Sequence, residues 1–173
     1  RYHVRFIQIY DGVEQVEPNE GNVRAIREKY NGKKLIFSVG RLVGYKGHKY
    51  LIESAKYLPE DYVILIGGNG PLFNTMQQQI EEENLNDKVV LLGRLSDEEL
   101  ADYYGACDLF CLSSIWKTEA FGMVQIEAMS CGCKVVITDL PGIRPWVEQR
   151  IENPPVFFVE PPEMVNADEP IPE

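Results

Sequence analysis

Short apolar segments alternate with segments of helical periodicity along most of this chain, and this alternation limits the folds that it can adopt. The apolar segments are rich in Val, Ile and Leu, which is typical of strands that are buried on both faces. Strands joined by crossover helices form a parallel sheet that helices cover on both sides. The predicted fold class is therefore α/β, with a doubly wound parallel sheet. Its predicted strands are Val4–Ile9, Lys34–Val39, Tyr62–Ile66, Lys88–Leu92, Asp108–Leu112 and Lys134–Thr138.

Helix signals occupy the segments between these strands. Val23, Ile26 and Tyr30 recur at the i, i+3, i+7 spacing of one helical face. Ser96 and Glu99 have the spacing of a capping box and predict the start of another helix. Further helices are predicted over His48–Leu58, Pro71–Asn84 and Phe121–Ser130.

The composition is that of a globular domain and argues against two kinds of partner. The 173 residues suffice for one domain with a hydrophobic core, and 45% of them are hydrophobic. Binding to a nucleic-acid backbone needs a basic surface, but the formal net charge is −10, so no nucleic-acid partner is expected. No apolar run approaches the roughly 18 residues of a transmembrane helix, so no transmembrane segment is expected.

Cysteine use indicates a reducing compartment. Cys107, Cys111, Cys131 and Cys133 all lie in apolar segments of a chain that is large enough to fold without a disulfide framework. Cys131 and Cys133 are closer together in sequence than the usual ligands of a zinc site. Buried core thiols are therefore favoured over a metal site, and the expected location is cytoplasmic.

The last part of the chain differs from the rest in composition. Prolines recur among acidic residues from Glu152 onward, and only Val156–Val159 has the composition of a strand. We therefore expect one domain over residues 1–150 and an extended tail or linker over residues 151–173. The chain opens on Arg1 without an initiator Met, so a piece of a longer protein is expected.

Ligands of an open parallel sheet bind outside the carboxyl ends of its strands, so the loops after the strands are the candidates for chemistry. The loop after Val39 sets Arg41 and Lys46 among three glycines. Glycines let the backbone approach a ligand closely, and the two cations can bind phosphate oxygens. A phosphate site and a solvated flexible loop are both compatible with this spacing.

The loop after Ile66 is rich in glycine and opens a helix, where exposed N–H groups attract anions. The dinucleotide fingerprint G-x-G-x-x-G is incomplete, because Phe73 stands where the third glycine would be. No Lys-Ser/Thr pair follows to make a P-loop. A plain tight turn is the alternative for this segment.

Two carboxylates, Glu119 and Glu127, flank the predicted start of the helix near Phe121. A full helical rise separates them by roughly 12 Å, which is the scale of a nucleotide sugar. One acid would then contact the sugar and the other the ribose, while the helix N-terminus, with room at Gly122, faces the diphosphate. Glu127 lies among apolar neighbours and needs hydroxyls or cations unless it is solvated at the helix edge.

Together these segments resemble the C-terminal, donor-binding domain of the family-4 retaining glycosyltransferases, which have GT-B architecture. Residues 40–47 are similar to the family's G-R-L-x-x-x-K-G loop, and residues 119–132 are similar to its E-x(7)-E signature. Residues 9–14 are similar to its N-G-V-D turn. The resemblance covers Val4 to Val147 and implies a Rossmann-like sheet, the C-terminal half of a GT-B fold. Ala120 replaces the usual Pro, and Cys133 and Lys134 also depart from the pattern.

The resemblance implies a role for each matching residue. Arg41 and Lys46 would hold the donor diphosphate and, with Glu119 on the transferred sugar, form the catalytic set. Glu127 would bind the ribose hydroxyls. The other implied donor-binding residues are Gly68 and Asn69, Arg94 and Leu95 beside the base, and the backbone of Phe121, Gly122, Met123 and Val124 at the sugar–phosphate junction.

The implied reaction moves a sugar from a UDP-, GDP- or ADP-sugar to an acceptor with retention. Negative charge develops on the leaving diphosphate, and preorganised cations and N–H donors stabilise it. No D-x-D motif is present, so no metal and no cofactor are expected. A carbohydrate or lipid acceptor would bind an N-terminal domain outside this chain, so the chain alone is expected to be inactive. The parent enzyme would act at the inner membrane surface in polysaccharide or glycoconjugate biosynthesis.

Two other interpretations remain open at this point. The chain could be a dinucleotide-dependent oxidoreductase domain, although its glycine fingerprint is incomplete. It could also be a non-enzymatic α/β interaction module, in which the loops have only a structural role.

Overall fold

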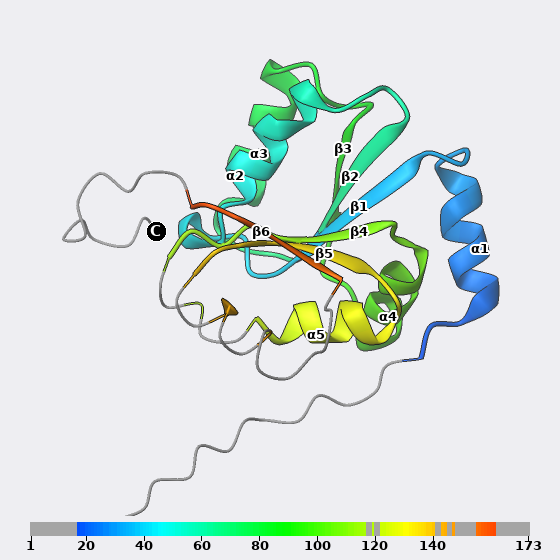
Figure 1. Ribbon diagram of the computed structural model, residues 1–173. Helices are drawn as coiled ribbons and strands as arrows, with labels where there is room; N and C mark the ends of the chain where they lie inside the picture. The colour runs from blue at the N-terminus through cyan, green and yellow to red at the C-terminus, as the bar shows by residue number, and fades with distance from the viewer. Residues whose placement is uncertain are drawn as a thin grey trace, which may run out of the picture.

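The computed structural model describes residues 17–116, 119, 122–140, 143–144, 147 and 155–161. Six strands form one sheet in the order β3-β2-β1-β4-β5-β6, and every neighbouring pair is parallel (Figure 1). The predicted doubly wound α/β fold is therefore confirmed. The strands are β1 (Lys34–Val39), β2 (Tyr62–Gly67), β3 (Val89–Gly93), β4 (Leu109–Leu112), β5 (Lys134–Thr138) and β6 (Val156–Val159).

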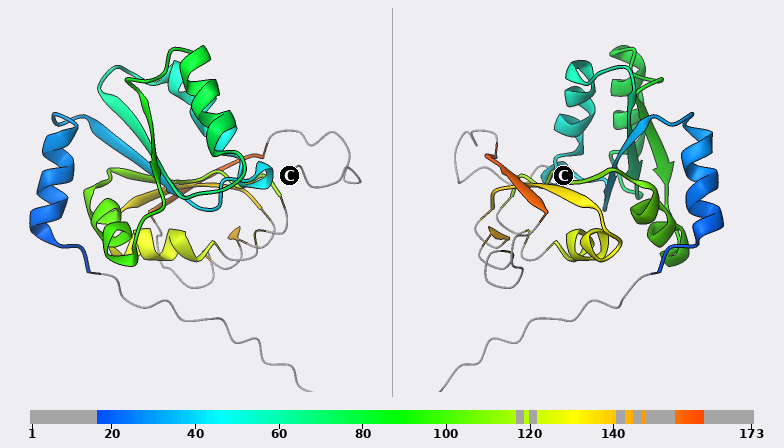
Figure 2. Two further views of the ribbon diagram at one scale, coloured as in Figure 1. Left: turned by 180° about the vertical axis from the view of Figure 1, so that it is seen from behind. Right: turned by 45° about the vertical axis from the view of Figure 1, so that its right-hand side comes forward.

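Helices cover both faces of the sheet (Figures 1 and 2). On one face, α2 and α3 enclose a core of aliphatic side chains that includes Ile52, Ile64 and Ile80. On the other, α4 and α5 lie over an aromatic core around Phe37 and Phe110, and α1 packs against α4. The helices are α1 (Glu20–Lys29), α2 (His48–Ser54), α3 (Phe73–Glu82), α4 (Asp97–Ala106) and α5 (Met123–Ser130), with short 3-10 helices η1 (Gly44–Lys46) and η2 (Ala55–Tyr57).

Some element ends differ from the prediction for local reasons. The predicted helix over His48–Leu58 is divided into α2 and η2, and the hydroxyl of Ser54 donates to the Leu51 carbonyl oxygen at 2.6 Å where α2 ends. Pro71 lies in a turn before α3 rather than in its first turn. The helix predicted from Phe121 begins at Met123, and Phe121 itself lies outside the described residues.

Three further predictions concern the start of α4 and the two outermost predicted strands. The capping box opens α4: the Glu99 backbone N–H donates to Ser96 Oγ at 3.2 Å, and the Ser96 N–H donates to Glu99 Oε2 at 2.7 Å. The strand at Val156–Val159, in the segment predicted as a tail, pairs with β5 as the edge strand, so the sheet includes it. The predicted strand Val4–Ile9 lies outside the described residues.

Candidate functional site

The loops that follow β1 and β2 are bound to each other at the carboxyl edge of the sheet. The N–H of Gly40 donates to the Gly67 carbonyl at 3.1 Å, and the N–H of Leu42 donates to the Asn69 carbonyl at 3.0 Å. Gly68 has a φ of +129°, and a Cβ there would lie 1.9 Å from the Gly40 carbonyl oxygen. Only glycine permits this approach, so these two glycine-rich loops form one rigid surface.

The loop after β1 is also bound to the loop after β4. The hydroxyl of Ser113 donates to the Lys46 carbonyl at 2.9 Å, and the N–H of Ile115 donates to the Tyr45 carbonyl at 2.9 Å. Gly47 has a φ of +68°, and a Cβ there would lie 2.0 Å from the Ser113 carbonyl oxygen. This close packing fixes η1, which carries Lys46, against the end of β4.

Lys46 and Glu119 meet at this edge although they are 73 positions apart in sequence. The Lys46 Nζ forms an ion pair with the Glu119 Oε2 atom, and the Ser114 hydroxyl donates to the same oxygen at 2.7 Å. The two charged side chains are 18% and 11% exposed, whereas Ser114 is fully buried. A buried hydroxyl therefore fixes one side of a carboxylate–ammonium pair that is still open to a ligand.

His48 lies beside this pair at the start of α2. A Cβ placed on Gly40 would lie 3.7 Å from the Lys46 Cδ and 3.8 Å from the His48 Cε1. The side chains of Lys46 and His48 therefore both pack against the backbone at Gly40. Burial first, and then the positive charge of Lys46, lower the pKa of His48 from 6.5 to about 4. The imidazole is therefore neutral at pH 7, and its buried Nδ1 has no hydrogen-bond partner among the described residues.

Glu127 lies on α5 and is held by a buried tyrosine. The Tyr104 hydroxyl donates to the Glu127 Oε2 atom at 2.9 Å. Tyr104 is fully buried and packs edge-on against the rings of Phe37 and Phe110. Burial first, and then the neighbouring Glu127, raise the pKa of Tyr104, so the phenol stays protonated and donates. The hydroxyl partner that the sequence required for Glu127 is thus Tyr104.

The remaining predicted residues that the structure describes lie along the same edge or at the start of α5. Arg41 and Asn69 are exposed on the loops after β1 and β2. Gly122 is buried and left-handed, with a φ of +55°, and Met123 next to it is 42% exposed in the first turn of α5. Val124 is partly buried.

A shallow depression of about 450 Å³ follows β3. Arg94 and Leu95, the residues predicted to border the base, line it together with the first residues of α4. The structure thus gives these two residues a concave surface, which Asp97 and Glu98 also line.

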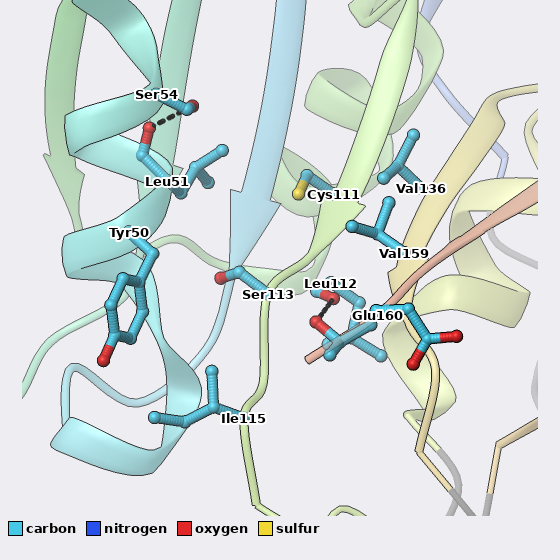
Figure 3. Close-up of a pocket in the computed structure, with 11 residues that line it drawn as sticks. Tyr50, Leu51, Ser54, Cys111, Leu112, Ser113, Ile115, Val136, Val159 and Glu160 are labelled. Atoms are coloured by element: carbon cyan, nitrogen blue, oxygen red, sulfur yellow. Dashed lines mark hydrogen bonds between the residues drawn. The ribbon is translucent and has the colours of Figure 1, made fainter. Parts of the chain in front are cut away.

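A second pocket, of about 350 Å³, is mainly apolar and lies between α2 and the strands β4, β5 and β6 (Figure 3). Tyr50 and Leu51 line it from α2, and Cys111 and Val136 line it from the sheet. None of the predicted site residues lines it. The candidate site is therefore the charged edge of the sheet rather than this pocket.

The sequence did not indicate Ser114 or Tyr104 as partners of the two site carboxylates. Spacing along the sequence does not predict these two residues, because Ser114 contacts Glu119 and Tyr104 contacts Glu127 only in the folded structure. His48 directly follows the last glycine of the cationic loop, so the sequence already places it beside that loop, as a structural residue rather than a catalytic one.

Two kinds of feature are absent from the described ranges. Within them, no three side chains of His, Cys, Asp or Glu gather where they could hold a metal ion. Nor does that part of the chain contain a helix with both the length and the apolar character needed to cross a membrane.

Comparison with known proteins gives consistent matches. Mannosylfructose-phosphate synthase of Agrobacterium fabrum is 33% identical over an alignment of 151 residues, and the match covers 80% of this chain and 33% of that protein. An N-acetylgalactosaminyltransferase of Campylobacter jejuni that acts on a diphospho-undecaprenol compound is 40% identical over 106 residues, 61% of this chain and 28% of that protein. The chain thus spans about a third of the length of these relatives.

Solved structures agree with the sequence matches. The crystal structure of Anabaena HepE in complex with UDP-glucose superposes with a TM-score of 0.72 at 25% identity, over 84% of this chain and 40% of that one. The family model described as "Glycosyl transferases group 1" matches residues 19–166, which is most of the chain. The protein therefore belongs to the group 1 glycosyltransferases, and its sheet is the Rossmann-like C-terminal half of a GT-B fold.

Proposed function

We propose that this chain is the donor-binding domain of a retaining, metal-independent glycosyltransferase that takes its sugar from a UDP-, GDP- or ADP-sugar. The observation that carries this proposal is the meeting of Lys46 and Glu119 at the carboxyl edge of the parallel sheet. A cation for phosphate and a carboxylate for sugar hydroxyls, side by side, suit a sugar diphosphate. The UDP-glucose in the HepE complex lends support.

The ion pair can serve both ends of the donor's reacting bond. An ammonium group has three N–H donors, so Lys46 can keep its contact with Glu119 and also donate to a phosphate oxygen. Glu119, fixed on one oxygen by Ser114, offers its other oxygen to hydroxyls of the transferred sugar. Arg41, exposed on the same loop, adds a second cation for the diphosphate.

These groups favour cleavage of the bond between the sugar's anomeric carbon and the diphosphate. Negative charge grows on the leaving oxygen, and Lys46, Arg41 and the N–H groups of Met123 and Val124 stabilise it. Two cations, Lys46 and Arg41, then take the role that a divalent ion has in metal-dependent enzymes. Glu127 binds the ribose, and the depression at Arg94 and Leu95 takes the base.

The acceptor side of the reaction is assigned to a second domain. We propose that a carbohydrate or a lipid bound by a domain N-terminal to this one receives the sugar, with the parent enzyme in the cytoplasm at the inner membrane surface. The diphospho-undecaprenol compound in the name of the Campylobacter relative supports a lipid-linked acceptor. The pathway would be polysaccharide or glycoconjugate biosynthesis.

Lys46→Ala tests this proposal, with Lys49→Ala as the matched control. Lys49 is an exposed lysine three residues further on whose ammonium lies over the Tyr50 ring. Calorimetric titration with UDP, GDP and ADP should show a loss of at least roughly tenfold in affinity for Lys46→Ala, the range for a charge-assisted hydrogen bond. Lys49→Ala should stay within about twofold of the wild type. Equal affinities for the two variants would contradict the proposal.

A further inference from the structure

Tyr104 connects the candidate ribose carboxylate to the centre of the sheet. Its ring centroid lies 5.5 Å from that of Phe37 on β1 and 5.6 Å from that of Phe110 on β4, both in edge-to-face geometry. All three rings are fully buried. The position of the Tyr104 hydroxyl is therefore fixed by the two strands whose loops carry Lys46 and Ser114.

The Tyr104 hydroxyl forms one hydrogen bond in this position. It donates to the Glu127 Oε2 atom at 2.9 Å, and burial keeps the phenol protonated. Among the described residues, no other side chain donates to the Glu127 carboxylate. Tyr104 thus holds one oxygen of Glu127 and leaves the second oxygen able to accept from a ligand.

Without this bond the Glu127 side chain would be poorly fixed. Glu127 is only partly buried, and α5, which carries it, is eight residues long and starts from a left-handed glycine. A glutamate has several accessible rotamers, and ordering one of them costs conformational entropy when a ligand binds. A bond from a buried, ring-packed donor removes most of that cost before binding.

We propose that Tyr104 is a positioning residue, whose hydroxyl holds the Glu127 carboxylate in the orientation that receives the ribose hydroxyls of the donor. This assignment rests on the proposed function, in which Glu127 binds the ribose. Tyr104 touches no substrate atom and acts only through Glu127. Its removal should therefore affect the recognition of ribose hydroxyls and nothing else about the nucleotide.

The test compares Tyr104→Phe with Tyr103→Phe. Tyr103 is the adjacent tyrosine, is partly buried and stacks on the same Phe37 ring, with the ring centroids 5.4 Å apart. Its variant therefore removes the same phenolic hydroxyl from a neighbouring ring. The ligands are whichever of UDP, GDP and ADP the wild type binds most tightly and the 2′,3′-dideoxy form of that nucleotide. Calorimetry gives the ratio of the affinity for the ribonucleotide to the affinity for its dideoxy form. Thermal unfolding confirms that each variant is folded.

Tyr104→Phe should weaken binding of the ribonucleotide by roughly tenfold and leave the dideoxy form within about twofold, so that the ratio falls. Tyr103→Phe should keep the wild-type ratio. In a Glu127→Ala background this affinity ratio should already be low, and adding Tyr104→Phe should not lower it further.

Three outcomes would overturn the assignment. Equal losses on both ligands for Tyr104→Phe would mean that Tyr104 only supports the fold. A ratio lost in Glu127→Ala but kept in Tyr104→Phe would overturn the positioning role and leave the proposed function intact. Failure of the wild type to bind any ribonucleoside diphosphate would overturn the proposed function, and with it this role of Tyr104.

Discussion

Single buried side chains set the electrostatics of this site. Lys46 forms an ion pair with Glu119, while His48 beside it loses its proton because the imidazole is buried. Two positive charges at this point would repel each other, and the neutral imidazole avoids that repulsion. The loop thus presents the charge of Lys46 to a phosphate without a competing cation from His48.

The same burial predicts a pH dependence of stability. His48 has a pKa of about 4 in the folded protein against 6.5 as its ordinary value, so the unfolded chain binds the proton more readily. The free energy of unfolding is therefore highest above pH 6.5. It falls by roughly 3 kcal/mol as the pH decreases from 6.5 to about 4. Urea unfolding across this range should show that loss in the wild type and a smaller one in His48→Gln.

The exposed neighbour Lys49 provides the control for this measurement. Lys49→Gln should keep the wild-type pH dependence, because a lysine does not titrate between pH 4 and 6.5. An unchanged slope in His48→Gln would show that other groups cause the acid sensitivity and that His48 is not held neutral by burial.

At the scale of elements, the contact between the loop after β1 and the loop after β4 decides whether the site forms. Gly47→Ala tests it, because the new Cβ would lie 2.0 Å from the Ser113 carbonyl oxygen. Gly32→Ala is the matched control, since Gly32 has a similar φ of +71° and nothing within 4 Å of a new Cβ. The difference between the two variants isolates the collision from the cost of a left-handed backbone.

Gly32→Ala should lower the free energy of unfolding by about 1 kcal/mol, the cost of the left-handed conformation alone. Gly47→Ala should cost about 1–3 kcal/mol in addition and should weaken nucleoside diphosphate binding, because the collision displaces η1 and Lys46. Denaturant unfolding and calorimetry measure the two effects. Equal stability and equal affinity in both variants would show that the contact between these loops does not form the site.

Across the whole molecule, the sequence predicted what depends on local pattern. Continuous apolar runs mark the strands of a parallel sheet, so β1, β2, β4 and β5 were predictable nearly to the residue. The loops at the carboxyl edge followed from the parallel topology. Which side chains meet there did not follow: Lys46 and Glu119 are joined by folding across 73 positions, and Tyr104 reaches Glu127 across 23. Such pairs depend on packing, which periodicity and spacing do not encode.

Binding of a nucleotide-sugar donor without metal can be measured by calorimetric titration of the wild-type chain. UDP, GDP, ADP and NAD would be titrated separately in EDTA and again with Mg²⁺. At least one nucleoside diphosphate should bind, its affinity should be the same under both conditions, and NAD should bind more weakly. Binding that requires Mg²⁺, or tighter binding of NAD than of all three nucleoside diphosphates, would contradict metal-independent donor binding.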